Sequence, residues 1–411
     1  MLALPPAPSW FPGHMAAFAK ALPSLLTKAH VVLEVRDARL PLTSVNSHLE
    51  ASLVEWLNAR HKTGGVRERI VVYTKKDLVP SWGEQRLRRA LAKHFDHHLH
   101  FVAPSSPHSI RALHSSLVST RNTDTTATLN VLVVGMPNVG KSTLLNSLRA
   151  KGTKSSQNEK PLKTSSLPGL TRALSTRLKL SSTHPIYAID SPGVMIPFLG
   201  HGDTGKERGV KFALIAGIKE SLYDDETLAS YLIWRLWKDR PNRNSPQSTN
   251  LQSNGPPPNP DPSKFDSYLV LGALAERIGA ISRGGSLDLD RAARYLVRWW
   301  RAGGHVKDGY DSHCTTVRSW GLDFEFNEEV PLGPLQRVEA DLVGNANGSD
   351  DPLQARMDGI VGRFVEELKG TGSGLGISAT QLKKREREEK KRVKVEKFKR
   401  SVVLPSNRQA P

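Results

Sequence analysis

The amino-terminal half of the chain alternates short apolar runs with stretches of helical periodicity. The runs are rich in β-branched residues and span Val31–Val35, Ile70–Tyr73, Asn130–Gly135 and Ile186–Asp190. Runs of this length and composition indicate buried strands. Their alternation with helical stretches is typical of a sheet covered by helices, so the pattern predicts an α/β domain over residues 1–204.

The pattern changes in the second half of the chain. Apolar residues recur every three or four positions over 205–240, and again over Tyr268–Ile281 and Asp288–Ala302, which predicts helices. Residues at about 240–264 are polar and proline-rich, and we expect a disordered insertion there. The sequence therefore predicts an all-α carboxyl-terminal domain over 205–334 that this insertion interrupts.

Composition adds a preference for polyanionic partners. The 411 residues include 58 basic and 40 acidic side chains, a net charge of +18, and residues 381–400 hold eleven basic and four acidic ones. We expect 335–411 to be a basic, largely disordered tail whose charges contact nucleic-acid phosphates. The single cysteine, Cys314, excludes an internal disulfide framework and a cysteine-based zinc site. No apolar run approaches the roughly 18 residues that span a bilayer, so we expect no transmembrane segment.

Residues 135–142, GMPNVGKS, fit the phosphate-loop pattern G-x-x-x-x-G-K-[ST]. A strand pattern comes directly before them and a helix pattern directly after, as such a loop requires. The glycines allow a tight turn, so that successive backbone N–H groups converge on phosphate oxygens. We expect Lys141 to reach the β- and γ-phosphates and the Ser142 hydroxyl to bind Mg²⁺.

A second motif, D-x-x-G, follows the strand at 186–190. We expect Asp190 to hold Mg²⁺ through water and the Gly193 N–H to sense the γ-phosphate. Between the two motifs lies LPGLTRAL, in which Thr171 is the candidate switch residue that closes on Mg²⁺ and acts in catalysis beside Lys141. Other hydroxyl side chains at 164–166 are alternatives to it.

Base recognition is expected earlier in the sequence than phosphate binding. IVVYTKKD (70–77) reads as a strand followed by T-K-x-D. Asp77 can accept hydrogen bonds from the guanine N1 and N2 donors, a pair that adenine lacks. Lys75 is expected to lay its aliphatic stem across the purine, and Thr74 stands where guanine-binding proteins usually have Asn. Taken by itself, the tetrapeptide also fits an ordinary solvated turn.

Another strand pattern, FVAPSS (101–106), ends in a serine pair that we expect to support the base through backbone N–H groups. The predicted nucleotide-binding residues combine the base and phosphate segments. They are Thr74, Lys75, Asp77, Ser105, Ser106, Gly135, Asn138, Val139, Gly140, Lys141, Ser142, Thr143 and Gly193.

Base motifs that precede the phosphate loop reverse the order of ordinary small GTPases, and this order resembles that of circularly permuted GTPases. WFPGHMAAFAKAL (10–22), VVLEVRDARLPLTSVN (31–46), GMPNVGKS, LPGLT and DSPGV together resemble the bacterial GTPases of large-subunit ribosome biogenesis and their mitochondrial relatives. The resemblance covers nearly all of 10–240 and continues in the helices to about residue 310. It leaves out 240–264 and the tail beyond 335.

The resemblance implies a permuted P-loop GTPase domain that hydrolyses GTP with Mg²⁺, often with K⁺ stimulation, and binds the immature large ribosomal subunit and its rRNA. Asn138 matches the family position linked to K⁺ coordination. Val194 replaces the Gln with which many GTPases orient water. The family's candidate for that task is the His of P-G-H-M, here His14, for which an interface histidine is the alternative interpretation.

The compartment also follows from the resemblance, which implies a mitochondrial protein on the matrix side and leaves open peripheral association with the inner membrane. The first acidic residue is Glu34, as in a presequence, yet no Arg occurs before Arg36. Two alternatives remain. One is a nucleolar or cytosolic GTPase of ribosome biogenesis, and the other is an RNA-binding assembly scaffold that holds GTP with little hydrolysis. Intact Lys141, Ser142 and Asp190 argue against the scaffold.

Overall fold

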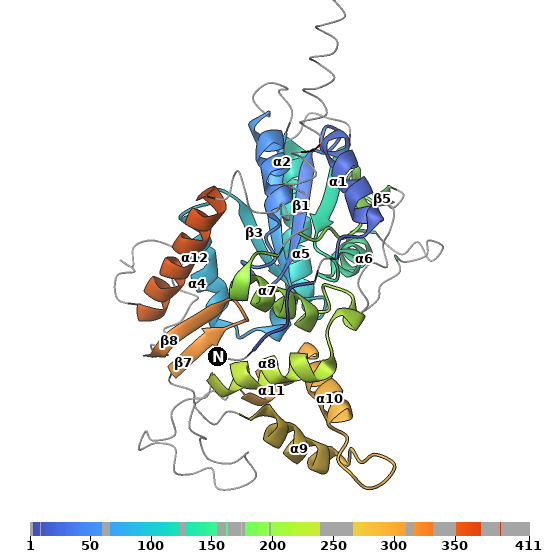
Figure 1. The fold of residues 1–411 in the computed structure, drawn as a ribbon. Coiled ribbons are helices and arrows are strands. Elements are labelled where there is room, and N and C mark those ends of the chain that lie inside the picture. The colour runs from blue at the N-terminus through green and yellow to red at the C-terminus, as the bar shows by residue number, and fades with distance from the viewer. Residues whose placement is uncertain are drawn as a thin grey trace, which may run out of the picture.

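A six-stranded sheet forms the centre of the molecule, and helices cover both of its faces (Figure 1). The computed structural model describes residues 3–8, 10–59, 66–123, 128–153, 162, 174, 177–196, 199–238, 266–309, 316–331, 351–370 and 387. The strands are β1 (Val31–Asp37), β2 (Glu68–Thr74), β3 (His98–Val102), β4 (Leu129–Gly135), β5 (Leu178–Lys179) and β6 (Ile186–Asp190). The four strands predicted from apolar runs are confirmed as β1, β2, β4 and β6.

The sheet order is β3-β2-β1-β4-β6-β5, and only β5 is antiparallel to its neighbour. The chain builds outward from β1 to β3 and then returns through helix α5 (Pro107–Thr123) to place β4 on the other side of β1. This reversal between β1 and β4 is a topological switch point, where open α/β sheets bind ligands at the carboxyl ends of their strands.

Side-chain alternation along each strand decides which helices cover which face. Val32 and Leu132 pack with helices α1 (Gly13–Leu26) and α2 (Ser47–Asn58) on one face. Their neighbours Val31 and Val131 pack with α5 and with α6 (Lys141–Gly152) on the other. Both faces of the central strands are therefore buried, and each such side chain contributes about 1.5–3 kcal/mol by leaving water.

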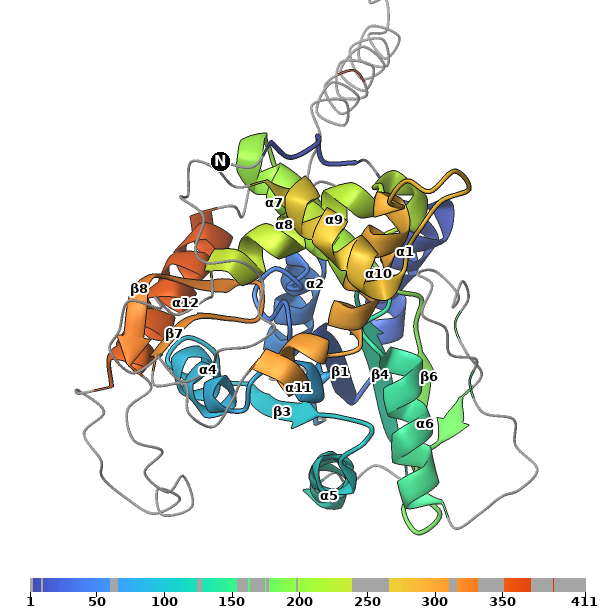
Figure 2. The ribbon, with the colours of Figure 1, turned by 90° about the horizontal axis from the view of Figure 1, so that it is seen from below.

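A helical region follows the sheet and continues the chain along one end of it (Figure 2). Its members are α7 (Gly202–Leu214), η2 (Glu220–Leu222), α8 (Asp225–Lys238), α9 (Ser267–Ile278), α10 (Leu289–Arg301) and α11 (Gly304–Gly309). The carboxylates of Asp266 and Asp288 cap the first turns of α9 and α10, and Gly279 ends α9 with φ +65°. These caps explain why two predicted helices begin and end within a few residues of the expected bounds.

An antiparallel hairpin, β7 (Thr316–Trp320) and β8 (Phe324–Pro331), lies inside the segment for which only helices were expected. The buried apolar side chains of Trp320, Phe324 and Phe326 pack against helix α4 (Trp82–Ala92) and its surroundings. The Trp320 indole N–H donates to the Pro80 carbonyl at 2.8 Å. The carboxyl-terminal region is therefore helical with one hairpin added, and its side chains are buried in a cluster that α4 shares with residues 353–365.

A second difference concerns the expected tail. Residues 352–370 form helix α12 (Pro352–Gly370), which lies along α4 (Figure 1). Apolar residues spaced by four, from Leu353 to Val365, are buried there, and Asp351 and Asp358 pair with Arg86 and Lys93. The expectation of an irregular tail is therefore wrong for this segment. The predicted insertion at 240–264 and the basic run at 381–400, apart from Arg387, lie outside the described residues.

The described helices also include the short turn η1 (Lys76–Leu78), directly after β2. Across the described ranges, no helix combines the length and the apolar composition that crossing a membrane requires.

The contact between the hairpin and α4 depends on the absence of a side chain at Gly83. A Cβ atom built there would lie 2.2 Å from the Trp320 indole nitrogen. We expect Gly83→Ala to lower the free energy of unfolding by about 1–3 kcal/mol, as overpacking does. Urea denaturation measures the difference.

Gly359→Ala in α12 is the matched control, since no atom lies within 4 Å of a Cβ at that position. It should stabilise the protein by up to about 1 kcal/mol through helix propensity. Equal effects of the two substitutions would show that the indole is not held on α4.

Candidate nucleotide-binding site

Loops that follow β1, β2, β4 and β6 meet at the carboxyl edge of the sheet. The loop after β4 bends tightly, with Gly135 at φ +149° and Gly140 at φ +88°. A Cβ at Gly135 would lie 2.2 Å from the Val35 carbonyl oxygen on the neighbouring strand. Gly135 therefore leaves no room for a side chain, and Gly140 permits a backbone angle that other residues rarely adopt. The loop then enters helix α6 at Lys141, and the first N–H groups of the helix are directed at the loop.

Lys141 is folded back onto this loop. Its ammonium group donates to the Met136 and Gly135 carbonyl oxygens at 2.7 and 3.2 Å, and the side chain is 6% exposed. Burial lowers the pKa of Lys141 to about 8, against the opposing attraction of Asp190. Within the described part of the chain, the Lys141 ammonium group is thus hydrogen-bonded only to neutral carbonyl oxygens, and charged phosphate oxygens would bind it more strongly.

Ser142 and Asp190 lie side by side although 48 positions separate them in the sequence. The Ser142 hydroxyl donates to Asp190 Oδ2 at 2.6 Å. Burial raises the pKa of Asp190, and the charge of Lys141 partly counteracts the rise. A hydroxyl and a carboxylate are hard oxygen ligands of the kind Mg²⁺ prefers, so these residues fit the metal that the sequence predicts.

The D-x-x-G segment closes against the phosphate loop. A Cβ at Gly193 would lie 2.5 Å from the Pro137 Cα, so only glycine permits this approach. One residue later, the Val194 N–H donates to the Gly135 carbonyl at 3.1 Å, and its carbonyl accepts from the Asn46 amide at 3.0 Å. The backbone of the predicted switch is thus attached to both the phosphate loop and the loop after β1.

The base segment also touches the phosphate loop. The Thr74 hydroxyl lies 2.5 Å from the Val139 carbonyl oxygen, which replaces the brace that an Asn would provide. Lys75, in the left-handed region at φ 58°, donates through Nζ to the Asn138 carbonyl at 2.8 Å. Asp77 is exposed in η1. Its carboxylate is therefore accessible to an incoming base.

The remaining predicted residues lie around this centre. Ser105 is exposed and Ser106 half-buried at the turn between β3 and α5, next to β2 at the same edge. Val139 is fully buried and Thr143 half-buried in the first turn of α6. Thr171 and its alternatives at 164–166 lie outside the described residues.

Asn138 and His14, the predicted K⁺ ligand and the predicted water-orienting residue, each lie beside another part of the chain. Asn138 is in the left-handed region at φ 58°, and its side-chain amide points to the Ile215 carbonyl at 3.4 Å, just beyond α7. His14 is half-buried in the first turn of α1. The next residue, Met15, is fully buried and its sulfur accepts the Met195 N–H at 3.4 Å. The start of α1 therefore contacts the chain two residues after Gly193.

Asp37 and Arg39 are charged residues at the site for which the sequence predicted no role. Asp37 ends β1 and accepts from the Lys75 ammonium at 2.9 Å and from the Arg39 guanidinium at 3.0 and 2.8 Å. Burial alone would raise the pKa of Asp37, but the two cations hold it far below its ordinary value. The sequence places Asp37 just after a predicted strand, in the segment VRDAR, but the sheet register is what puts it beside the strand that leads to Lys75.

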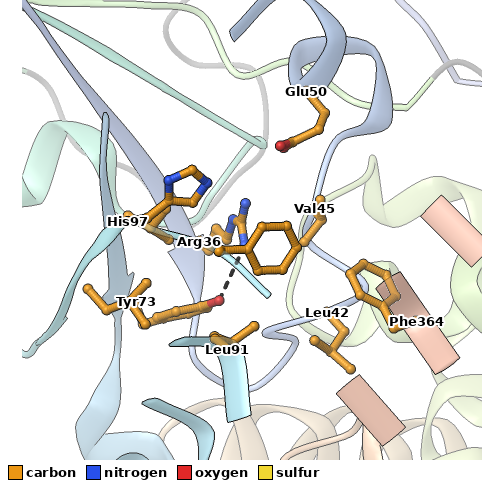
Figure 3. Close-up of a pocket in the computed structure, with 11 residues that line it drawn as sticks. Arg36, Leu42, Val45, Glu50, Tyr73, Leu91, His97 and Phe364 are labelled. Carbon is orange, nitrogen blue, oxygen red and sulfur yellow. Dashed lines mark hydrogen bonds between the residues drawn. The ribbon is translucent and has the colours of Figure 1, made fainter. Parts of the chain in front are cut away.

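A separate polar cluster under α12 does not belong to this site (Figure 3). It surrounds a cavity of about 10 Å³, room for roughly one water molecule. The Arg36 guanidinium donates to Glu34 at 2.7 Å and to the Tyr73 hydroxyl at 3.3 Å. Burial opposes ionisation of Glu34, but Arg36 and Arg69 lower its pKa to about 2. The cluster is a neutralised part of the core.

Known proteins are similar to parts of this chain. A family model described as a 50S ribosome-binding GTPase matches residues 130–228, from β4 into α8. Among solved structures, GNP-bound YlqF from T. maritima aligns with 69% of this chain and 93% of its own, at 17% identity and a TM-score of 0.41.

Curated relatives are more similar. Mitochondrial GTPase 1 of Schizosaccharomyces japonicus is 32% identical over 317 residues, which cover 72% of this chain and 87% of the relative. Mitochondrial ribosome-associated GTPase 1 of Mus musculus is 29% identical over 55% of this chain and 66% of its own length. With this similarity to a relative, and with strands β1 to β3 preceding the phosphate loop along the chain, the protein belongs to the mitochondrial GTPase 1 family of circularly permuted GTPases.

Proposed function

We propose that this GTPase hydrolyses GTP to GDP and phosphate in mitochondria and acts there in assembly of the large ribosomal subunit. The proposal rests on the arrangement of Lys141, Ser142 and Asp190 at the carboxyl edge of the sheet, where the segment with Lys75 and Asp77 meets the phosphate loop. The names of the relatives, which include mitochondrial and ribosome-associated GTPases, support the compartment and the partner. A matrix location and peripheral attachment to the inner membrane are part of the same proposal.

Each residue has a distinct task in binding. Asp77 accepts from the guanine N1 and N2 donors, and the Lys75 stem lies on the purine face with its amine anchored on Asp37. Ser105 and Ser106 support the base from the neighbouring loop. Turn amides of the loop from Gly135 to Thr143 bind the phosphates.

Lys141 leaves its carbonyl partners for the β- and γ-phosphates. Ser142, Asp190 and Thr171 would hold Mg²⁺, which neutralises charge on the phosphate oxygens. The Asn138 amide oxygen is our candidate ligand for K⁺, and the Gly193 N–H senses the γ-phosphate.

Hydrolysis also needs a group that orients water. Val194 is 2% exposed and apolar, so it cannot do this. We assign the task to His14, because α1 begins where Met15 contacts Met195 beyond the switch. The basic tail, together with the charge of +18, supports contact with rRNA phosphates.

One contact connects the phosphate loop with the end of α7, and a second holds that end of α7 against α10. Asn138 reaches the Ile215 carbonyl, and the Arg301 guanidinium donates to the Leu214 and Ala213 carbonyls at 2.8 and 2.9 Å, at the end of α7. A shift of the 190–193 switch on loss of the γ-phosphate would therefore move α7 and re-aim the helical region, which changes RNA affinity with nucleotide state.

We expect subunit-stimulated hydrolysis to require His14. GTP turnover would be measured in K⁺ and Na⁺ buffers, with purified mitochondrial or cytosolic large subunits, for wild type and His14→Ala. The prediction is higher turnover in K⁺ and with mitochondrial subunits, and a loss of stimulation of at least about 100-fold in His14→Ala with nucleotide affinity unchanged.

His108→Ala is the matched control, because His108 is likewise the second residue of a helix but is exposed. Full stimulation of His14→Ala would remove the assignment of that residue. Stimulation by cytosolic subunits alone would overturn the compartment. Stimulation by neither, with GTP still bound, would favour the assembly scaffold.

Nucleotide affinity should depend on pH through Lys141. Its pKa of about 8 in the free protein means that the amine loses its charge as pH rises from 7 to 9. Bound phosphates need the charged form, so GDP affinity should fall roughly tenfold over this range. Titration calorimetry at several pH values measures this slope.

Lys141→Met provides the reference in which this amine is absent. It should bind GDP more weakly at every pH and show only the slope that the other groups of the site and the nucleotide contribute. The same slope in both proteins would mean that Lys141 keeps its charge throughout and that burial does not lower its pKa.

If the 190–193 switch moves the helical region, protease sensitivity within 205–330 should differ between the GDP complex and the complex with a non-hydrolysable GTP analogue. Arg301→Ala should reduce the difference, because it frees the end of α7. Arg298→Ala, an exposed arginine one turn earlier on α10, should not. Identical wild-type cleavage with both nucleotides would contradict the coupling.

A further inference from the structure

The loop after β1, Ala38–Asn46, is enclosed by other parts of the chain. All of its side chains except Thr43 are buried. A buried loop cannot rely on water for its backbone N–H groups, so the protein must supply acceptors. Asp323, at the turn of the β7–β8 hairpin, supplies the acceptor for two of these N–H groups. Its Oδ2 accepts the Leu42 and Thr43 N–H groups at 2.9 and 2.7 Å.

The same carboxylate has a third bond to this loop. Its Oδ1 accepts the Thr43 hydroxyl at 2.5 Å, and the Asp323 side chain is 2% exposed. Beside it, the Leu322 N–H donates to the Arg39 carbonyl at 2.8 Å. Gly321 at φ +60° permits that approach, since its Cβ would lie 2.8 Å from the Arg39 carbonyl oxygen.

The hairpin is itself fixed from two sides. Trp320 is fully buried and donates to Pro80 at the start of α4. Glu325 forms ion pairs with Arg235 and Lys238 on α8. The turn that carries Asp323 is therefore a rigid support, attached both to the sheet domain and to the helical region.

From this loop, contacts lead to the base lysine. Arg39 is held by the hairpin through its carbonyl and by Trp300, over whose ring its guanidinium lies at 5.0 Å. Its N–H and guanidinium fix the Asp37 carboxylate, which in turn accepts from Lys75 at 2.9 Å. The Lys75 stem thus has a set direction before any base arrives.

We propose that Asp323 is a positioning residue for guanine-nucleotide binding, acting through the Ala38–Asn46 loop, Asp37 and Lys75. It does not touch the nucleotide. By holding the loop it keeps Lys75 in one rotamer, so that binding does not have to order a long flexible side chain. The inference rests on the proposed function only in taking Lys75 as the residue that covers the base.

The test is a double-mutant cycle on GDP affinity in the full chain. Thr43→Val removes one of the bonds to Asp323 and keeps the shape of the side chain, and Asp323→Asn replaces an acceptor by a donor facing two N–H groups. We expect Asp323→Asn to weaken GDP binding roughly tenfold, about 1.4 kcal/mol, and Thr43→Val by a smaller factor in the same direction. Asp203→Asn, an exposed carboxylate on α7 that pairs with Lys206, is the control and should leave Kd unchanged.

The cycle partner is Lys75→Met, which keeps the aliphatic stem but has no amine to anchor on Asp37. In that background Thr43→Val and Asp323→Asn should change Kd by less than about twofold. Their full effect in the Lys75→Met background, or no effect in wild type, would overturn the proposal and leave Asp323 a purely structural residue.

Urea denaturation of each variant separates folding from binding. If Asp323→Asn fails to fold, the Thr43→Val cycle decides the outcome by itself. Failure of the wild-type chain to bind GDP would contradict the proposed function instead, so the two failures are distinguishable.

Discussion

Parallel pairing of β1, β2, β4 and β6 places four chain reversals at one edge of the sheet, and every part of the nucleotide site depends on it. A strand that ends at this edge must leave it through a loop, and each loop here carries a polar group that faces the others: Asp37, Lys75, the phosphate loop and Asp190. The order of strands in the sheet determines these neighbours. The order along the chain does not, which is why the strand that leads to Lys75 can precede the phosphate loop without changing these contacts.

Features with local causes were predictable from the sequence. Gly135 and Gly193 have no room for a side chain, and Gly140 has a positive φ that other residues rarely adopt, so the spacing of these glycines indicates the loops directly. The apolar runs also predicted the central strands, because a strand buried on both faces is a nearly continuous apolar run, which Glu34 interrupts in β1 at one position only within Val31–Val35. The base segment was found by its place after such a strand, and the structure brings it against the phosphate loop through Thr74 and Lys75.

Features with distant partners were not predictable in the same way. Nothing near Asp37 in the sequence indicates that Lys75, 38 positions on, shares its carboxylate. The hairpin has short alternating runs, but its Trp320 can be buried only because Gly83, more than two hundred positions earlier, leaves room for the indole ring. Helix α12 repeats its apolar residues every four positions, a pattern hidden within a segment whose composition is otherwise irregular. In each case the decisive contact joins segments that only the folded sheet brings together.

The helical region therefore touches the site at two points with different chemistry. The Ile215 carbonyl connects it to the phosphate loop, at the end of α7 that Arg301 holds. The hairpin and Trp300 connect it to the loop after β1 through Arg39. Phosphate contacts differ between GTP and GDP, whereas base contacts are common to both. One connection can thus respond to hydrolysis while the other keeps the base lysine in place. Because the permuted chain runs from the 190–193 switch directly into α7, the responsive connection is also the covalent one, and the constant connection is made by residues that return from more than a hundred positions later.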